Sequence, residues 1–191
     1  MTSFPKVSNS AFGGMTALLL AVLSWFLPIG TCSADGERYE GLIRQAALRH
    51  KVDPLLIKAV ISQESKFNER ATGSSGEIGL MQVKIGAAQD WAEANEVPVP
   101  SKRHLYNPEL NIEVGAWYLA RALNTWSGYK ACITLALCEY NQGRKTVRTW
   151  RPERGSPFVY IRSSSARCYV ESVRDKFIEY SKTGYYTVAL N

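Results

Sequence analysis

One stretch decides the fold of this chain, Val60-Ile61-Ser62-Gln63-Glu64-Ser65-Lys66-Phe67-Asn68. It continues an apolar segment that starts after Asp53-Pro54, a pair typical of a helix N-cap followed by proline in the first turn. We therefore predict a buried helix over residues 55–64, with Glu64 where it leaves the apolar surroundings. Partial burial of a carboxyl group raises its pKa and keeps it protonated, as a general acid requires.

A glutamate at a helix end is, taken alone, more often an ordinary solvated or paired residue. The residues after Glu64 favour a functional reading. A loop of turn-forming residues, 72–76, leads to Gly79-Leu80-Met81-Gln82, which adds a thioether and an amide side chain close behind the acid.

Helical periodicity recurs along the chain after the N-terminal segment. Besides 55–64, we predict helices over residues 38–50, 85–95, 107–125, 129–140 and 165–182. No segment shows the alternation of a strand, so the predicted fold class is all-α, or α with a minimal hairpin.

Residues 1–34 are predicted to be a secretory signal peptide. Lys6 precedes an apolar run over residues 17–27, and small residues up to Ala34 suit cleavage before Asp35. The run is shorter than the about 20 residues that cross a bilayer, so we expect no membrane span after cleavage. A second possibility is a lipoprotein anchored at Cys32, because residues 29–32 resemble a lipobox.

The chain is mildly basic. Its formal net charge is +6, and removal of Lys6 with the signal leaves +5. This charge suits an anionic polymer such as cell-wall glycan with its peptide carboxylates. No basic run of the kind found in nucleic-acid-binding arms is present, so no nucleic-acid partner is predicted.

Three cysteines, Cys132, Cys138 and Cys168, remain in residues 35–191. An odd number in an oxidising compartment predicts one disulfide and one free thiol. Cys132 and Cys138 lie on different faces of one predicted helix, so Cys168 is expected to pair with either of them. His50 and His104 lack ligand spacing to any cysteine, and we predict no metal site and no cofactor.

Four segments resemble, in order, the motifs of the soluble lytic transglycosylase family. They lie within residues 60–82, 107–119, 140–150 and 167–170. Together they cover most of the chain from about residue 38 to residue 182. The resemblance implies a single lysozyme-like catalytic domain over residues 35–191, exported to the periplasm, with peptidoglycan as the substrate.

The resemblance also implies a reaction. Glu64 would protonate the glycosidic oxygen between N-acetylmuramic acid and N-acetylglucosamine and then act as base, so that the muramoyl 6-hydroxyl attacks its own C1 and forms a 1,6-anhydro end. An intramolecular hydroxyl has a high effective molarity, so no second carboxylate is needed. Tyr169 would hydrogen-bond or orient Glu64. The implied substrate contacts are Met81, Gln82, Tyr140 and Asn141.

Each of these residues also has a structural interpretation. Met81 could fill the core, Tyr140 and Tyr169 could be packing aromatics, and Asn141 could close its helix near Gly143.

The chain departs from the family's pattern at four positions. Gly73 stands where serine is usual, so a serine contact to the substrate's N-acetyl group is not carried over. Lys84 replaces a frequent methionine, and Glu77 and Glu139 replace residues that are usually alanine. Either glutamate could raise the pKa of Glu64 or act as the second carboxylate of a hydrolase, although Glu77 is expected to be solvated.

Two other functions stay open at this point. One is a hydrolytic muramidase of goose-lysozyme type, in which Glu77 or Glu139 directs water. The other is a non-catalytic wall-binding or assembly module, which would have no need of a positioned acid. By analogy alone, a compact domain would suit a pilus, conjugation or secretion machine.

Overall fold

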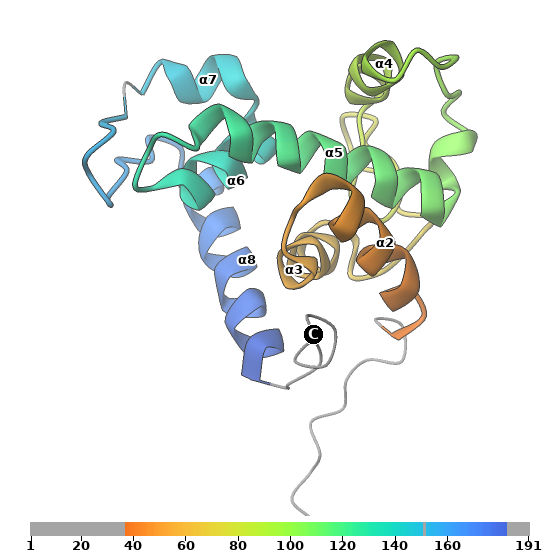
Figure 1. Cartoon of the computed structure of the whole chain (residues 1–191), viewed down its shortest axis with the longest axis horizontal. Helices are drawn as coiled ribbons and strands as arrows, with labels where there is room; N and C mark the ends of the chain where they lie inside the picture. The colour runs from red at the N-terminus through yellow and green to blue at the C-terminus, as the bar shows by residue number, and fades with distance from the viewer. Residues whose placement is uncertain (1–36, 151, 183–191) are drawn as a thin grey trace, which may run out of the picture. The chain divides into compact units, whose positions relative to one another are not determined.

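The computed structural model describes residues 37–150 and 152–182, and the predicted signal peptide lies outside these ranges. Figure 1 shows the helical elements of the described part in chain order. They are α2 (Glu40–His50), α3 (Pro54–Ser65), α4 (Ile85–Ala94), the 3-10 helix η1 (His104–Tyr106), α5 (Pro108–Trp126), α6 (Cys132–Gln142), α7 (Arg144–Arg148) and α8 (Ser164–Lys182).

The predicted all-α fold class is confirmed, and the six predicted helices are present with ends shifted by a few residues. Extended pairing in the described ranges is confined to isolated bridges from Ile78 to Thr72 and to Val83, the minimal hairpin that the prediction allowed. The short helix α7 was not predicted, because only Gly143 separates it from α6. The φ of Gly143 is +82°, a value that turns the chain sharply between the two helices.

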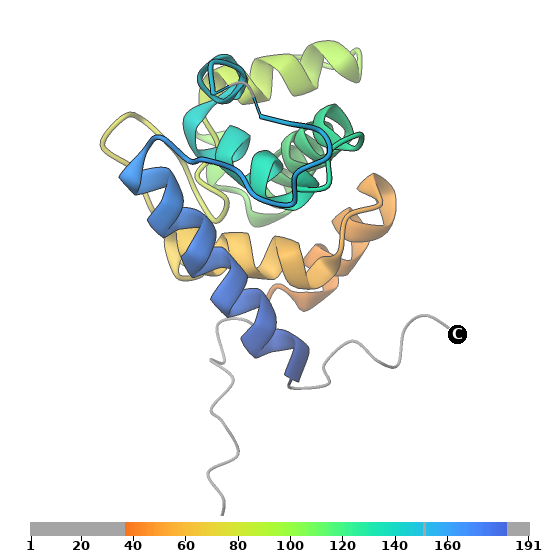
Figure 2. The ribbon, with the colours of Figure 1, turned by 90° about the vertical axis from the view of Figure 1, so that its left-hand side faces the viewer.

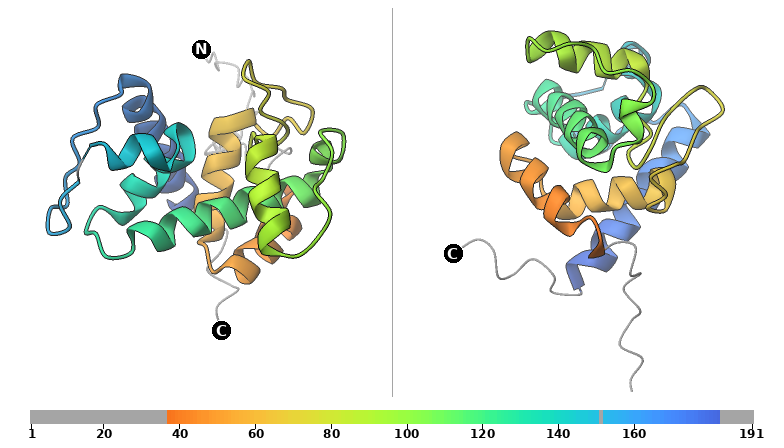
Figure 3. Two further views of the ribbon diagram at one scale, coloured as in Figure 1. Left: turned by 90° about the horizontal axis from the view of Figure 1, so that it is seen from above. Right: turned by 90° about the vertical axis from the view of Figure 1, so that its right-hand side faces the viewer.

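Helix α3 lies at the centre of the core. Ile57, Val60 and Ile61 are fully buried on it, and it packs against both α2 and α8. Figure 2 shows α3 and α8 crossing side by side. Helix α5 packs against α2, α4 and α6, and Figure 3 shows it crossing α3. Residues from distant parts of the chain are thereby brought to the C-terminal end of α3.

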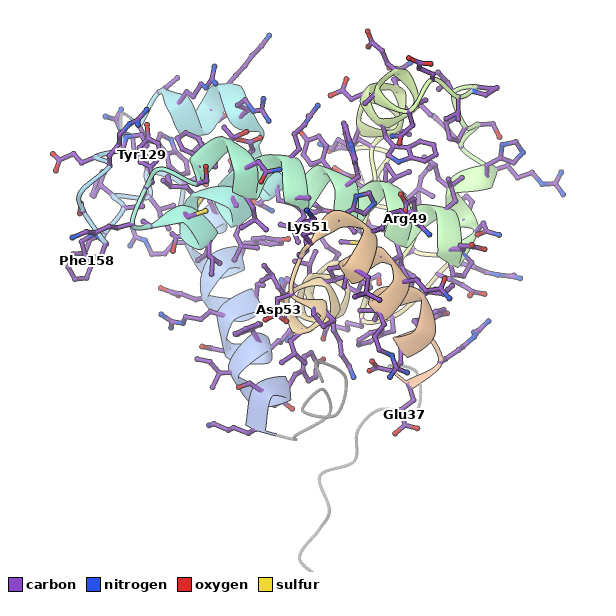
Figure 4. The ribbon with its side chains drawn as sticks, viewed as in Figure 1. Glu37, Arg49, Lys51, Asp53, Tyr129 and Phe158 are labelled. Carbon is purple, nitrogen blue, oxygen red and sulfur yellow. The ribbon has the colours of Figure 1, made fainter. Side chains whose placement is uncertain are left out.

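The helix starts follow the capping signals in the sequence. The side chain of Asp53 accepts a hydrogen bond of 2.8 Å from the backbone N–H of Leu55, at the start of α3 (Figure 4). Asn107 caps α5 in the same way through the N–H of Leu110, at 3.1 Å. Proline follows each cap, and its fixed φ suits the first helical position.

The ends of helices α2 and α3 turn through left-handed residues. Lys51 closes α2 with a φ of +55°, and Lys66 closes α3 with a φ of +52°. Arg49 and His50, just before this turn in α2, both contact the carboxylate of Glu113 and so tie α2 to α5. The turn at Lys66 ends α3 at Ser65, which leaves Glu64 in the last helical turn.

A buried asparagine holds the loop that follows α3. Asn111 of α5 is 1% exposed, donates to the carbonyl oxygens of Ile78 and Leu105 at 2.8 and 2.7 Å, and accepts from the N–H of Met81 at 2.8 Å. Gly79 has a φ of +76°, and a Cβ there would lie 2.5 Å from the Asn111 amide nitrogen. The chain therefore needs glycine at this position to pass close to Asn111.

The predicted disulfide is wrong for the described part of the chain. Cys132, Cys138 and Cys168 are all free thiols. Cys138 is fully buried on α6, whereas Cys168 is exposed on α8, and the Sγ of Cys132 lies 3.4 Å from the carbonyl oxygen of Leu123. Disulfide geometry brings two Cβ atoms to about 4 Å. The prediction used the number of cysteines and the compartment, neither of which specifies the helix face that a cysteine occupies.

None of the helices in the described ranges combines the length and the apolar character needed to cross a membrane.

Candidate active site

Glu64 lies where α3 meets α8. The hydroxyl of Tyr169, which is 6% exposed on α8, donates a hydrogen bond of 2.8 Å to Oε1 of Glu64. The two residues are 105 positions apart in the sequence, and the packing of α8 against α3 brings them together. The contact between Glu64 and Tyr169 that the resemblance implied is present in the structure.

Burial changes the ionisation of this carboxyl group. The pKa of Glu64 is raised from 4.5 to about 7, and desolvation by burial is the largest cause. The hydrogen bond from Tyr169 and the charge of Lys84 act in the opposite direction and lower the pKa, whereas the charge of Glu77 raises it. Burial, together with the nearby Glu64 charge, also raises the pKa of both Tyr140 and Tyr169 well above 10. At neutral pH the site therefore contains a substantial fraction of protonated Glu64 and two neutral phenols that can donate hydrogen bonds.

A cavity of about 510 Å³ opens beside Glu64. Its walls come from the end of α3, the loop before α4, and helices α4, α5 and α6. The lining residues are Glu64, Glu77, Gln82, Val83, Lys84, Gly86, Ala87, Asp90, Val114, Gly115, Tyr118, Tyr140, Asn141, Gln142 and Gly143.

Three of the predicted substrate-contacting residues line this cavity. Gln82 has a φ of +48°, and its amide donates to the carbonyl oxygen of Gly79 at 2.8 Å. Tyr140 donates to the carbonyl oxygen of Met81 at 2.9 Å, which joins α6 to the loop before α4. Asn141 is exposed at the end of α6, and its side-chain oxygen accepts a hydrogen bond of 2.6 Å from the side-chain amide of Gln142. Gln82 and Tyr140 are thus held by backbone contacts.

The fourth, Met81, is placed differently. Its side chain is fully buried and does not line the cavity, so the predicted substrate contact by this side chain is wrong. A Cβ at Gly115 of α5 would lie 2.5 Å from its sulfur, which shows how closely α5 approaches it. The structural interpretation holds for Met81, because its thioether fills the space that a glycine leaves on α5.

Tyr118 and Asp90 line the cavity but were not predicted. Tyr118 packs edge-on against Tyr140, with ring centroids 5.9 Å apart. Arg121 lies over the Tyr118 ring at 4.5 Å and pairs with Asp90 at 2.9 Å, which connects α5 to α4. The helical spacing of Val114, Gly115 and Tyr118 was a usable signal for one shared face of α5.

The two glutamates that replace usual alanines have different surroundings. Glu139 is fully buried and accepts a hydrogen bond of 2.9 Å from the indole N–H of Trp126. It also forms an ion pair of 2.8 Å with Arg144, and so stabilises the junction of α6 and α7. Glu77 was expected to be solvated. It is instead partly buried on the cavity wall, 3.1 Å from the ammonium of Lys84. Of the two, only Glu77 shares the cavity with Glu64.

No cluster of three or more His, Cys, Asp and Glu side chains that could hold a metal ion occurs in the part of the chain that the structure describes.

Comparison with known proteins agrees with this geometry. The family model described as the transglycosylase SLT domain matches residues 41–157. The chain belongs to the SLT transglycosylase family. The predicted family is thereby confirmed, and the match includes Glu64 and all the cavity-lining residues.

Curated relatives of this SLT domain have longer chains. It is 39% identical over 136 residues to a membrane-bound lytic murein transglycosylase C from Edwardsiella ictaluri, covering 68% of this chain and 38% of that one. The protein of the same name from Cronobacter sakazakii is 37% identical over 94 residues, which cover 48% and 26% of the two chains. The domain therefore spans well under half of each relative.

Solved structures share the fold. An inactive mutant of the lytic transglycosylase Slt from Pseudomonas aeruginosa, with glutamate replaced by glutamine, superposes with a TM-score of 0.65 at 26% identity, over 75% of this chain and 24% of that chain. The 70-kDa soluble lytic transglycosylase from Escherichia coli matches with the same values. A complex of the 70-kDa soluble lytic transglycosylase with bulgecin A gives a TM-score of 0.64. The fold is the all-α, lysozyme-like fold of this family.

Proposed function

We propose that this chain is an exported peptidoglycan lytic transglycosylase. It cleaves the β-1,4 bond between N-acetylmuramic acid and N-acetylglucosamine and leaves 1,6-anhydromuramoyl ends. The observation that carries the proposal is the carboxyl group of Glu64, which has a pKa of about 7, lines a cavity of about 510 Å³ and is hydrogen-bonded to Tyr169. The names of the relatives, which act on murein, support it.

The same carboxyl group acts twice in this reaction. Oε1 of Glu64 accepts from Tyr169, so Oε2 carries the proton that goes to the glycosidic oxygen as the C1–O bond breaks. The resulting carboxylate takes the proton of the muramoyl 6-hydroxyl while that oxygen bonds to C1. Glu64 ends protonated again, and no water is consumed. A pKa near neutral pH suits both the donating and the accepting step.

The cavity walls supply the saccharide contacts in this proposal. Gln82, Tyr140 and Asn141 bind the sugars, and Tyr169 orients the acid. Gln82 and Tyr140 are well suited to this because backbone contacts already restrict them, so substrate binding orders little that was mobile.

Export and domain limits belong to the proposal as well. Residues 1–34 act as the signal peptide and residues 35–191 as the catalytic domain, located in the periplasm. The relatives are named membrane-bound, which fits the second possibility, lipid attachment at Cys32. A domain of this kind would suit local opening of the wall for a pilus, conjugation or secretion machine.

A hydrolytic muramidase is the second candidate, because Glu77 lines the same cavity as Glu64 and could direct a water molecule. The products separate the two reactions. Mass spectrometry of digested sacculi should show anhydromuramoyl ends for the transglycosylase and reducing ends for the hydrolase.

The replacement Glu64→Gln tests the role of the acid. It preserves the shape of the side chain but removes the transferable proton, and general acid-base catalysis contributes about 10²–10⁴-fold. We expect release of anhydromuropeptides to fall by at least about a hundredfold with an unchanged circular dichroism spectrum. Glu171→Gln, at an exposed carboxylate on α8, is the matched control. Activity of Glu64→Gln within about threefold of the wild type would remove Glu64 from the mechanism.

A further inference from the structure

An ion pair lies on the wall of the cavity that contains Glu64. The Lys84 ammonium is 3.1 Å from Oε1 of Glu77. Oε2 of Glu77 accepts a hydrogen bond of 3.0 Å from the backbone N–H of Ser75. The two partners differ in exposure, with 21% of the Glu77 side chain and 59% of the Lys84 side chain accessible. The carboxylate is therefore held against the loop, and the ammonium is the more accessible group.

Gly73 makes room for this pair. A Cβ at position 73 would collide with the carboxylate of Glu77 and lie 2.9 Å from the amide oxygen of Gln82. A serine at position 73 would therefore require the Glu77 carboxylate to move away from its present position. Three of the four positions at which the chain departs from the family's pattern, Gly73, Glu77 and Lys84, therefore form one structural unit beside the candidate acid.

Stability does not account for the pair. A solvent-accessible ion pair changes the free energy of unfolding little, because water screens it and two side chains lose freedom. An ammonium has three N–H donors, so a second acceptor can bind while Glu77 keeps Lys84 near the wall. The position of the pair is then better explained by binding than by folding.

Among the cavity-lining residues that the structure describes, Lys84 is the one cationic residue. The acidic lining residues are Glu64, Glu77 and Asp90. Asp90 is paired with Arg121, which does not line the cavity, and Glu64 is partly protonated at neutral pH. An anionic group of a bound polymer therefore finds its favourable contact at Lys84.

We propose that Lys84, held in place by Glu77, binds a carboxylate of the peptide stem of the glycan strand and gives the site a preference for strands that carry such carboxylates. This inference rests on the proposed function, because it assumes that murein enters the cavity. Binding of a substrate carboxylate costs little desolvation, because the Lys84 ammonium is already accessible and keeps Glu77 as its other partner.

The test compares two substrates. Soluble murein strands are used either untreated or after carbodiimide coupling of their carboxylates to methylamine, which removes the negative charges. Wild-type protein should have a kcat/KM about three- to tenfold higher on the untreated strands, mainly through KM, and this ratio should fall at high salt. Lys84→Met should lower the ratio to about one. Because the charge of Lys84 also lowers the pKa of Glu64, the measured quantity is the ratio of the two substrates within each variant, and not the absolute kcat/KM.

Two variants serve as controls. Lys84→Arg keeps the charge and should retain the preference, whereas Lys102→Met removes an exposed lysine that does not line the cavity and should match the wild type.

Equal losses on both substrates in Lys84→Met would overturn the inference, as would a wild type that does not discriminate between them. In either case, anhydromuramoyl products would leave the proposed function standing. Absence of those products on both substrates would instead contradict the proposed function.

Discussion

At the scale of single residues, the ionisation of Glu64 links stability to chemistry. Desolvation is the largest effect on its pKa, and it disfavours the carboxylate. The folded protein therefore holds a group that would be more stable ionised in water. Burial keeps the carboxyl group protonated and makes proton donation possible at neutral pH. The same burial lowers the free energy of unfolding once the group ionises.

The first prediction concerns this cost. The pKa of Glu64 is about 7 in the folded protein and 4.5 in the unfolded chain, so the folded state binds more protons between these values. The free energy of unfolding therefore falls as the pH rises from 4.5 to 7. Glu64→Gln cannot ionise, and it should be more stable than the wild type above pH 7, by up to about 3 kcal/mol, with the difference lost below pH 4.5. Urea unfolding across this range measures it, and a difference independent of pH would contradict the assignment.

Tyr169→Phe tests the hydrogen bond to the acid. The ring packing is kept, whereas a hydrogen bond to a charged group contributes about 1.5–3 kcal/mol, so turnover should fall about tenfold to a hundredfold. The hydrogen bond lowers the pKa of Glu64, so its loss should move the alkaline limb of kcat/KM to higher pH. Tyr160→Phe, at a residue that is 78% exposed, is the control. An unchanged pH profile and turnover would make Tyr169 a packing residue.

At the scale of elements, the loop before α4 depends on α5. Asn111 makes three hydrogen bonds to backbone groups of Ile78, Met81 and Leu105, and these groups are otherwise enclosed by apolar residues. The segment held in this way leads directly to Gln82 and Lys84 on the cavity wall. The cavity is therefore built as much by α5 as by the loop itself.

Asn111→Ala should damage stability and activity together. It leaves the buried N–H of Met81 and the carbonyl oxygen of Leu105 without their partner, at a cost of about 3 kcal/mol, whereas the carbonyl oxygen of Ile78 keeps the N–H of Val83. Asn124→Ala, at an exposed position of the same helix, should change little. Thermal unfolding and amide hydrogen exchange at Met81 measure the effect. A melting temperature within about 2 °C of the wild type would show that water replaces the lost contacts.

At the scale of the whole molecule, the packing of the helices determines how reactive each cysteine thiol is. Burial raises the pKa of Cys138 to about 12, whereas Cys168 is exposed. Cys168 should therefore react with an alkylating reagent in the folded protein, and Cys138 only after unfolding. Non-reducing peptide mapping should show Cys132, Cys138 and Cys168 unlinked, and a reductant should not change the melting temperature. A peptide that links Cys168 to either of the others would contradict the structure.

The sequence by itself determined the elements that depend on local interactions. Asp53-Pro54 and Asn107-Pro108 specify helix starts through caps only two or three residues long, and the apolar run before Glu64 specifies a buried helix. The resemblance of ordered motifs was enough to single out Glu64 and Tyr169 and to name their family. Local hydrogen bonds and side-chain periodicity act within a few residues, so they can be read without the rest of the chain.

Only the tertiary structure decided which side chains face the cavity. Met81 and Gln82 are neighbours in sequence, yet the first is buried against Gly115 and the second lines the cavity. The burial of Glu139, the pairing of Glu77 with Lys84 and the separation of the cysteines likewise follow from how helices and loops meet. These outcomes depend on packing between residues far apart in the chain. A local pattern does not specify such packing, because it leaves open which partner covers each face.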